Sequence, residues 1–160
     1  MNDERKKMTI IVFSNDLDKA MAAFILATGA ASAAIEVTMY FTFWGLSLLR
    51  KPASKSPQKS FIDRMFGWML PKGPTGTRLS KLHFLGAGTS MMKGVMRSKK
   101  MPQLEELMDM AVAMNVKIVA CTTSMGIMGI SREELIDQIE IGGVATYLGT
   151  ARDSAINLFI

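Results

Sequence analysis

The sequence contains one strong nucleophile, the thiol of Cys121, which is the single cysteine of the chain. A thiolate rather than a thiol attacks an electrophile, and unpaired backbone N–H groups nearby lower the thiol pKa. The next residues, Thr122 to Met125, leave a predicted strand, so we expect their amides to hold this pKa below the ~8.5 of a free cysteine. A buried cysteine that acts as a small apolar side chain explains the same residue, and both interpretations stay open.

A glycine-rich stretch, GAGTSMMKG at 86–94, can receive an anion at the start of its predicted helix. It does not match the dinucleotide fingerprint, because Met91 stands where GxGxxG needs its last glycine. The glycines also fit a simple turn of the chain, so anion binding is one of two open interpretations. The candidate substrate-binding residues are Asn15, Gly86, Gly88, Thr89, Thr122, Ser124 and Met125.

The other residues that could do chemistry favour structural roles. The one histidine, His83, lies in the middle of a predicted strand, and we assign it to packing rather than to a base for Cys121. A chain with one cysteine and one histidine excludes a cysteine-cluster zinc site and a histidine-rich metal site. The fifteen methionines fit gap filling in the core better than copper binding, so we expect no metal.

These residues must be positioned by a fold, and the composition is that of one globular domain. The chain has 160 residues, of which 49% are hydrophobic and 21% are charged. We expect residues 1–160 to form a single domain. Residues 45–78 hold four of the five prolines and interrupt the pattern, so we expect an insertion there.

Short apolar runs that are rich in β-formers alternate with helical patterns along the chain. The pattern predicts an α/β fold with an open, mostly parallel five-stranded sheet, helices on both faces, and a helical insertion after the second strand. The predicted strands lie at 8–14, 36–43, 79–85, 117–120 and 155–159. The predicted helices lie at 17–33, after the glycine turn up to about 100, from 102 onward, at 131–140 and from 143 to about 153.

The carboxyl ends of parallel strands form the edge at which open α/β sheets bind ligands. Asn15, the 86–90 turn and Cys121 each follow a predicted strand. We therefore expect these residues to meet at one edge, with Cys121 beside the 86–90 turn.

The net charge of +5 conceals an uneven distribution. Residues 50–100 carry +11, whereas the rest of the chain carries −6. Such a block suits an anionic partner, a membrane or an oligomer face, although a solvated surface explains it as well. The segment FIDRMFGWML at 61–70 is amphipathic, and we favour a lid or subunit interface over membrane contact. No nucleic-acid motif is present, and we expect no nucleic-acid partner.

The N-terminal segment does not have the pattern of a signal peptide, because its apolar run at 8–13 meets Asn15 and Asp16 at once. The longest uncharged stretch, at 20–35, is too short for a transmembrane helix. Together with a lone cysteine, these features favour a cytoplasmic protein.

Four segments have a distinctive sequence: CTTSMGIMGI at 121–130, EEL at 133–135, GGVA at 142–145 and FGWMLPKG at 66–73. They resemble the DsrE/DsrF-like sulfur-transfer family, and more closely its branch labelled DsrE-like or peroxiredoxin-like. The resemblance covers nearly the whole chain. It implies that Cys121 holds sulfane sulfur as a persulfide and passes it to partner proteins by thiol exchange. It further implies sulfur-donor and sulfur-acceptor partners, no metal or organic cofactor, and a homo-oligomer, since many relatives form trimers or hexamers.

We therefore predict a sulfur carrier or sulfurtransferase that uses Cys121. A peroxiredoxin reaction is not expected, because the chain has no second cysteine to resolve a sulfenic acid. The alternative is a non-catalytic ligand-binding or assembly protein, or one peripheral to a membrane, in which Cys121 is structural. Fast alkylation of the thiol near neutral pH distinguishes the first hypothesis from the second.

Overall fold

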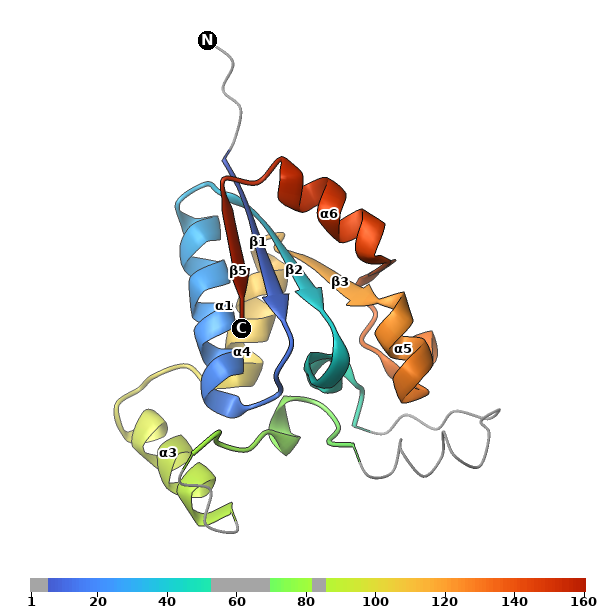
Figure 1. Cartoon of the computed structure of the whole chain (residues 1–160). Helices are drawn as coiled ribbons and strands as arrows, with labels where there is room; N and C mark the ends of the chain where they lie inside the picture. The colour runs from blue at the N-terminus through green and yellow to red at the C-terminus, as the bar shows by residue number, and fades with distance from the viewer. Residues whose placement is uncertain (1–5, 53–69, 82–85) are drawn as a thin grey trace.

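The computed structural model describes residues 6–52, 70–81 and 86–160 (Figure 1). Five parallel strands form one sheet in the order β4-β3-β2-β1-β5. They are β1 (Lys7–Val12), β2 (Glu36–Phe41), β3 (Lys117–Cys121), β4 (Glu140–Gly142) and β5 (Ile156–Phe159). The predicted α/β class with a parallel sheet is confirmed.

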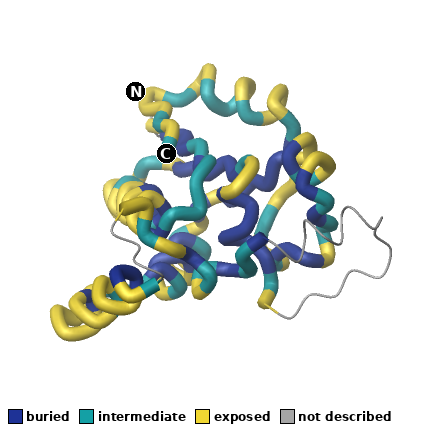
Figure 2. The backbone as a smooth tube through the Cα atoms, turned by 60° about the horizontal axis from the view of Figure 1, so that its bottom comes forward, coloured by how far each residue is buried: buried dark blue, intermediate teal, exposed yellow. Residues whose placement is uncertain are grey.

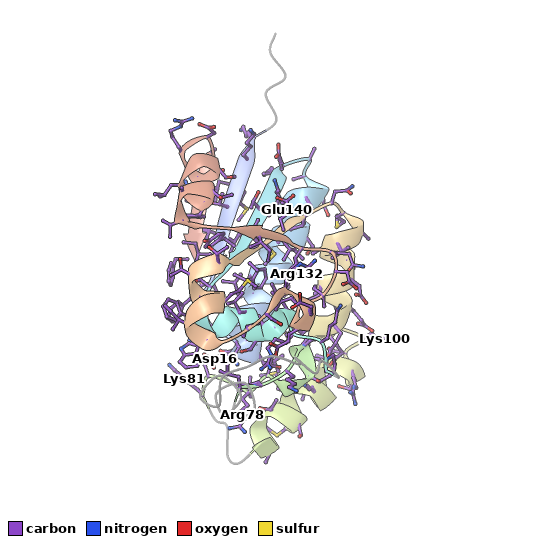
Figure 3. The ribbon with its side chains drawn as sticks, turned by 90° about the vertical axis from the view of Figure 1, so that its right-hand side faces the viewer. Asp16, Arg78, Lys81, Lys100, Arg132 and Glu140 are labelled. Carbon is purple, nitrogen blue, oxygen red and sulfur yellow. The ribbon has the colours of Figure 1, made fainter. Side chains whose placement is uncertain are left out.

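Helices cover both faces of the sheet. The helices α1 (Leu17–Ser32) and α4 (Leu104–Ala113) pack together on one face, and α6 (Val144–Arg152) crosses the other (Figures 1 and 3). Parallel strands connect by right-handed crossovers. The chain moves from β1 towards β4 in one direction and returns across the sheet to β5 in the other, so α6 lies opposite to α1.

The main core lies between the sheet and α1 with α4. The spacing of apolar residues in the sequence predicts the inner face of α4, and the four residues concerned are all buried: Leu104, Leu107, Met108 and Ala111. The two central strands supply the opposite wall, where Ile10, Met39 and Phe41 are fully buried. The core thus fixes the strands whose carboxyl ends carry the candidate site.

The predicted strand at 79–85 is wrong for its described residues. Residues 79–81 lie in no strand, because the chain here bonds to the start of α1 rather than to a neighbouring strand. The Leu17 N–H donates to the Arg78 carbonyl at 2.7 Å. The remainder of this segment, including His83, lies outside the described residues.

The predicted helix at 131–140 is wrong beyond its first turn. Ser131 and Glu134 form a capping box, but only a 3₁₀ turn, η4 (Arg132–Glu134), follows it. The Glu134 carboxylate is buried and pairs with the buried Arg50 guanidinium at 2.8 Å. Arg50 also forms an isolated antiparallel β-bridge with Leu135, the residue after Glu134. These long-range bonds draw the chain out of a helix and lead it into β4, one of the two edge strands of the sheet.

The insertion after β2 is described only at its two ends. It begins with the 3₁₀ helix η1 (Phe43–Leu49) and ends with η2 (Pro74–Gly76), while the amphipathic segment at 61–70 lies outside the described residues except for the buried Leu70. Gly45 lets η1 approach β1 closely, because a Cβ there would lie 2.1 Å from the Val12 carbonyl oxygen. None of the helices in the described part of the chain combines the length and apolar character needed to cross a membrane.

Candidate functional site at the carboxyl end of β3

Cys121 is the last residue of β3 and directly precedes α5 (Thr122–Met128), so it lies at the carboxyl edge of the sheet. The first amides of a helix have no partner within the helix. One of them, the Ser124 N–H, lies within hydrogen-bonding reach of the Cys121 sulfur. The side chain of Cys121 is buried, with 3% of its surface exposed.

The strand β2 and the residue that follows it place two hydroxyl groups, those of Tyr40 and Thr42, on the same face as the Cys121 side chain. Tyr40 pairs with Val119 in the parallel register, and continuing this register brings Thr42 beside Cys121. Side chains two residues apart on a strand share a face. The Thr42 hydroxyl lies 2.7 Å from the Ser124 hydroxyl, and both are within reach of the sulfur.

Two tyrosine rings close the site. The rings of Tyr40 and Tyr147 pack with their centroids 5.3 Å apart, and Tyr147 comes from α6. The Tyr40 hydroxyl donates to the Gly142 carbonyl at 3.2 Å and is also within reach of the Cys121 sulfur. Tyr40, Val119 and Cys121 form a small buried cluster against which Tyr147 packs. The thiol therefore sits in a closed site that aromatic rings and hydroxyl groups surround.

This environment lowers the pKa of Cys121 to about 7. Burial alone would raise the pKa, because it disfavours the charged thiolate. Hydrogen bonds from the Tyr40 hydroxyl, the Ser124 N–H and the hydroxyls of Ser124 and Thr42 together outweigh this effect. A substantial fraction of Cys121 is therefore thiolate near neutral pH, which is the form that attacks sulfur.

The pKa of Tyr40 is raised by its burial first, and further by its hydrogen bond to Cys121 and by the charge of that residue. Tyr40 thus keeps its proton over the whole range in which Cys121 ionises. The side chain is a hydrogen-bond donor to the sulfur and not a base for it.

The other predicted site residues lie in three places. Of those near Cys121, Thr122 is exposed at the start of α5, Ser124 is buried beside the sulfur, and Met125 packs partly against the main core. Asn15 lines a pocket of about 300 Å³ together with Trp44 and Arg78. The structure therefore does not bring all the predicted residues together.

The glycine turn lies at the start of α3 (Ala87–Ser98), which is on the other side of the molecule from α5 (Figure 1). Gly86 and Thr89 line a hollow of about 320 Å³ whose cationic residues are Arg78 and Lys93. Gly88 is buried in the first turn of α3. The expectation that Cys121 lies beside this turn is wrong, because among the described residues the strands that flank β3 are β2 and β4, and the turn follows neither of them.

Sequence reasoning missed Tyr40, Thr42, Gly142 and Tyr147. The signal for the first two is present in the sequence, since they lie two residues apart near the end of the predicted strand at 36–43 and therefore share a face of the sheet. It becomes readable only once β2 is known to neighbour β3. Among residues 6–52, 70–81 and 86–160, no group of three or more His, Cys, Asp or Glu side chains is arranged to hold a metal ion.

The chain matches the model of the DsrE/DsrF/DrsH-like family over residues 4–159. It is 45% identical over 160 residues to the uncharacterized protein YrkE of Bacillus subtilis, and the match covers 100% of both chains. It is 33% identical over 166 residues to the sulfur carrier protein DsrE2 of Allochromatium vinosum, a match that covers 98% of this chain and 99% of that protein. The crystal structure of the YchN protein from E. coli has the same fold, with a TM-score of 0.56 at 12% identity over 97% of this chain and 99% of that chain.

Proposed function

Because the chain belongs to the DsrE/DsrF/DrsH-like family, we propose that it is a sulfur carrier or sulfurtransferase that holds sulfane sulfur as a persulfide on Cys121 and passes it to partner thiols. A relative named as a sulfur carrier supports sulfur transfer as a role within this family. The observation that carries the proposal for this chain is the Cys121 thiol itself. Its pKa is about 7 because hydrogen bonds to the sulfur outweigh its burial.

The first step loads the carrier. The Cys121 thiolate attacks the outer sulfur of a donor persulfide, R–S–SH, and a new S–S bond forms. The S–S bond of the donor breaks, and its electron pair leaves on the donor sulfur as the thiolate R–S⁻. One sulfur atom moves, the charge is conserved, and no external oxidant or reductant is consumed.

The second step reverses the roles of the two sulfurs. An acceptor thiolate attacks the outer sulfur of the Cys121 persulfide, and Cys121 leaves as a thiolate. Low-pKa thiols leave faster in such exchanges. The hydrogen bonds that favour the Cys121 thiolate as an attacking group therefore also favour it as a leaving group. Proteins with reactive thiols are the donor and acceptor partners of this proposal.

Mass spectrometry of the intact protein tests this function. After incubation with polysulfide or a persulfidated donor, we expect the wild type to gain about 32 Da, the mass of one sulfur atom, and to lose it when a reductant is added. Because Cys121 is the single cysteine, any reducible gain reports on that residue. Cys121→Ser is the matched control, because the two side chains are nearly the same size, and it should gain nothing.

An unloaded wild type under all these conditions would overturn the proposal. It would favour the alternative, a ligand-binding or assembly protein in which Cys121 is structural. The homo-oligomer and the cytoplasmic location stay predictions, which size-exclusion chromatography with light scattering and cell fractionation would test.

A further inference from the structure

We propose that the Tyr40 hydroxyl is a hydrogen-bond donor that follows the charge of the Cys121 sulfur. It bonds to the Gly142 carbonyl while Cys121 carries its proton, and it turns to the sulfur when Cys121 is ionised. The ionised sulfur is the form that attacks a donor and leaves towards an acceptor. This role of Tyr40 therefore rests on the proposed function.

The order of the strands places the Tyr40 side chain over Cys121. The strand β3 lies between β2, which carries Tyr40, and β4, which carries Gly142. The hydroxyl donates to the Gly142 carbonyl at 3.2 Å, so the side chain reaches across the whole of β3. Gly142 is the register partner of Cys121. Neighbouring strands are about 4.8 Å apart. Tyr40 lies beside Val119, so its side chain runs diagonally across β3 and its hydroxyl ends near Cys121.

The two acceptors compete for one proton. A phenol carries a single O–H donor, so Tyr40 can donate to the carbonyl or to the sulfur, but not fully to both. A hydrogen bond to an ionised acceptor is about twice as strong as one between neutral groups. While the thiol is neutral, the Tyr40 hydroxyl keeps its hydrogen bond to the Gly142 carbonyl. When the thiol ionises, the hydroxyl turns to the thiolate. The switch needs only a rotation about the C–O bond or a small tilt of the ring.

Few other ionisable groups could produce the same effect. In the described part of the chain, the titratable group that α6 brings to this cluster is Tyr147. The charged side chains of β3 and β4, Lys117 and Glu140, pair with each other at 3.1 Å near the amino ends of those strands. Arg152, at the far end of α6, pairs with the adjacent aspartate at 3.0 Å. The sulfur is therefore governed by neutral donors, among which Tyr40 comes first.

The pH profile of alkylation tests this role in the variant Tyr40→Phe, which keeps the ring and removes the donor. We expect the midpoint to rise by about one pH unit. Thiolate reactivity increases with thiol pKa with a slope of about 0.4–0.5 on logarithmic scales. The variant should therefore react with iodoacetamide about threefold more slowly than the wild type below pH 6 and about threefold faster above pH 9. A variant that only loosens the packing would not produce profiles that cross.

Tyr147→Phe is the matched control. It makes the same change in the adjacent ring, and the groups that bond to the sulfur do not include the Tyr147 hydroxyl. Its midpoint should equal that of the wild type. A midpoint in Tyr40→Phe that is also unchanged would overturn the role of Tyr40, even if sulfur loading proceeds normally. Conversely, a shifted midpoint in a protein that never loads sulfur would refute the proposed function and leave the role of Tyr40 intact.

A second measurement uses the wild-type chain and does not depend on how the variant folds. The sequence has two tyrosines, so labelling the ring carbon that bears the hydroxyl with ¹³C gives two NMR signals, which Tyr147→Phe assigns. We expect the Tyr40 signal to shift with pH at the midpoint of Cys121 alkylation. The same shift should be absent in Cys121→Ser. A Tyr40 signal that stays constant through the ionisation of Cys121 would contradict the switch.

Discussion

The two ends of the carboxyl edge of this sheet have opposite characters. At one end, Cys121 is 3% exposed and is enclosed by tyrosine rings and hydroxyl groups. At the other end, the start of α3 borders an open hollow with Arg78 and Lys93, and α3 is largely exposed (Figure 2). Arg78, whose backbone forms an isolated parallel β-bridge with Asp16, lies at the carboxyl end of the sheet (Figure 3). The rule that open α/β sheets bind ligands at their carboxyl edge locates both ends. It does not make them one site.

The difference shows two physical ways to favour an anion. Neutral donors inside the closed site lower the pKa of Cys121, and no lysine or arginine of the described residues is among the causes of that shift. The charged side chains of the hollow beside α3 are cationic: Arg78 is exposed and Lys93 is half-buried. Hydrogen bonds inside a closed site are little affected by salt, whereas exposed charges are screened by it. Neutral hydrogen-bond donors therefore suit a buried thiol that must ionise better than exposed cationic side chains do.

The largest effect separates the two ends by loss of function. Cys121→Ser should abolish sulfur loading, whereas Lys93→Gln and Thr89→Val at the α3 hollow should leave the loading rate within about twofold of the wild type, because they lie away from the reacting sulfur. Intact-mass measurement over time after addition of polysulfide gives both rates. A large loss of loading in either α3 variant would show that the two ends act together and would break the comparison.

The identity of the nucleophile was predictable from residue type and from the edge rule, because Cys121 ends a run of buried β-formers. The rest of its site was not. Tyr40 and Thr42 act through the pairing of β2 with β3, which joins residues about 80 positions apart in the sequence. The predicted strand at 79–85 lies between β2 and β3 in the sequence, so the sequence did not indicate that β2 and β3 are neighbours in the sheet.

The strands and helices with long apolar patterns were predictable for a similar reason. The inner face of α4 follows directly from its spacing. The strand β4 has three residues, too few to show a period, and the buried Arg50–Glu134 ion pair decides the path that leads to it. Long-range polar contacts of this kind override a local capping box, and no single window of sequence contains both partners.

The next effect concerns pH. Since the pKa of Cys121 is lowered to about 7, the thiol is protonated below that value and thiolate above it. The alkylation rate should therefore fall about tenfold per pH unit below the midpoint and level off about one unit above it. Because neutral donors produce the shift, the midpoint should move by less than about 0.3 units between low and high salt. A strongly salt-dependent midpoint would mean that charges such as those beside α3 control the thiol.

A smaller effect concerns the packing of the closed end. A Cβ on Gly142 would lie 2.9 Å from a methyl carbon of Val119 and 3.1 Å from the Thr146 methyl. Gly142→Ala should therefore lower the free energy of unfolding by about 1–3 kcal/mol, the usual cost of overpacking. Urea unfolding monitored by circular dichroism measures this. The loss of stability should come with a change in the rate of Cys121 alkylation, because Gly142 is the register partner of that residue. An unchanged free energy of unfolding would show that the packing around Gly142 is loose.

The smallest effect concerns the open end, where a glycine-to-alanine substitution should raise rather than lower the free energy of unfolding. Gly94 lies inside α3, and among the described residues a Cβ there would meet no atom within 4 Å beyond the adjacent residues and the helix backbone. Alanine is favoured over glycine in an exposed helix by up to about 1 kcal/mol, because glycine loses more backbone entropy on folding. Gly94→Ala should therefore raise the free energy of unfolding by up to that amount without changing sulfur loading. A loss of stability, measured by the same urea titration, would mean that another surface covers this side of α3 in solution, and the open character of this end would then belong to the isolated chain alone.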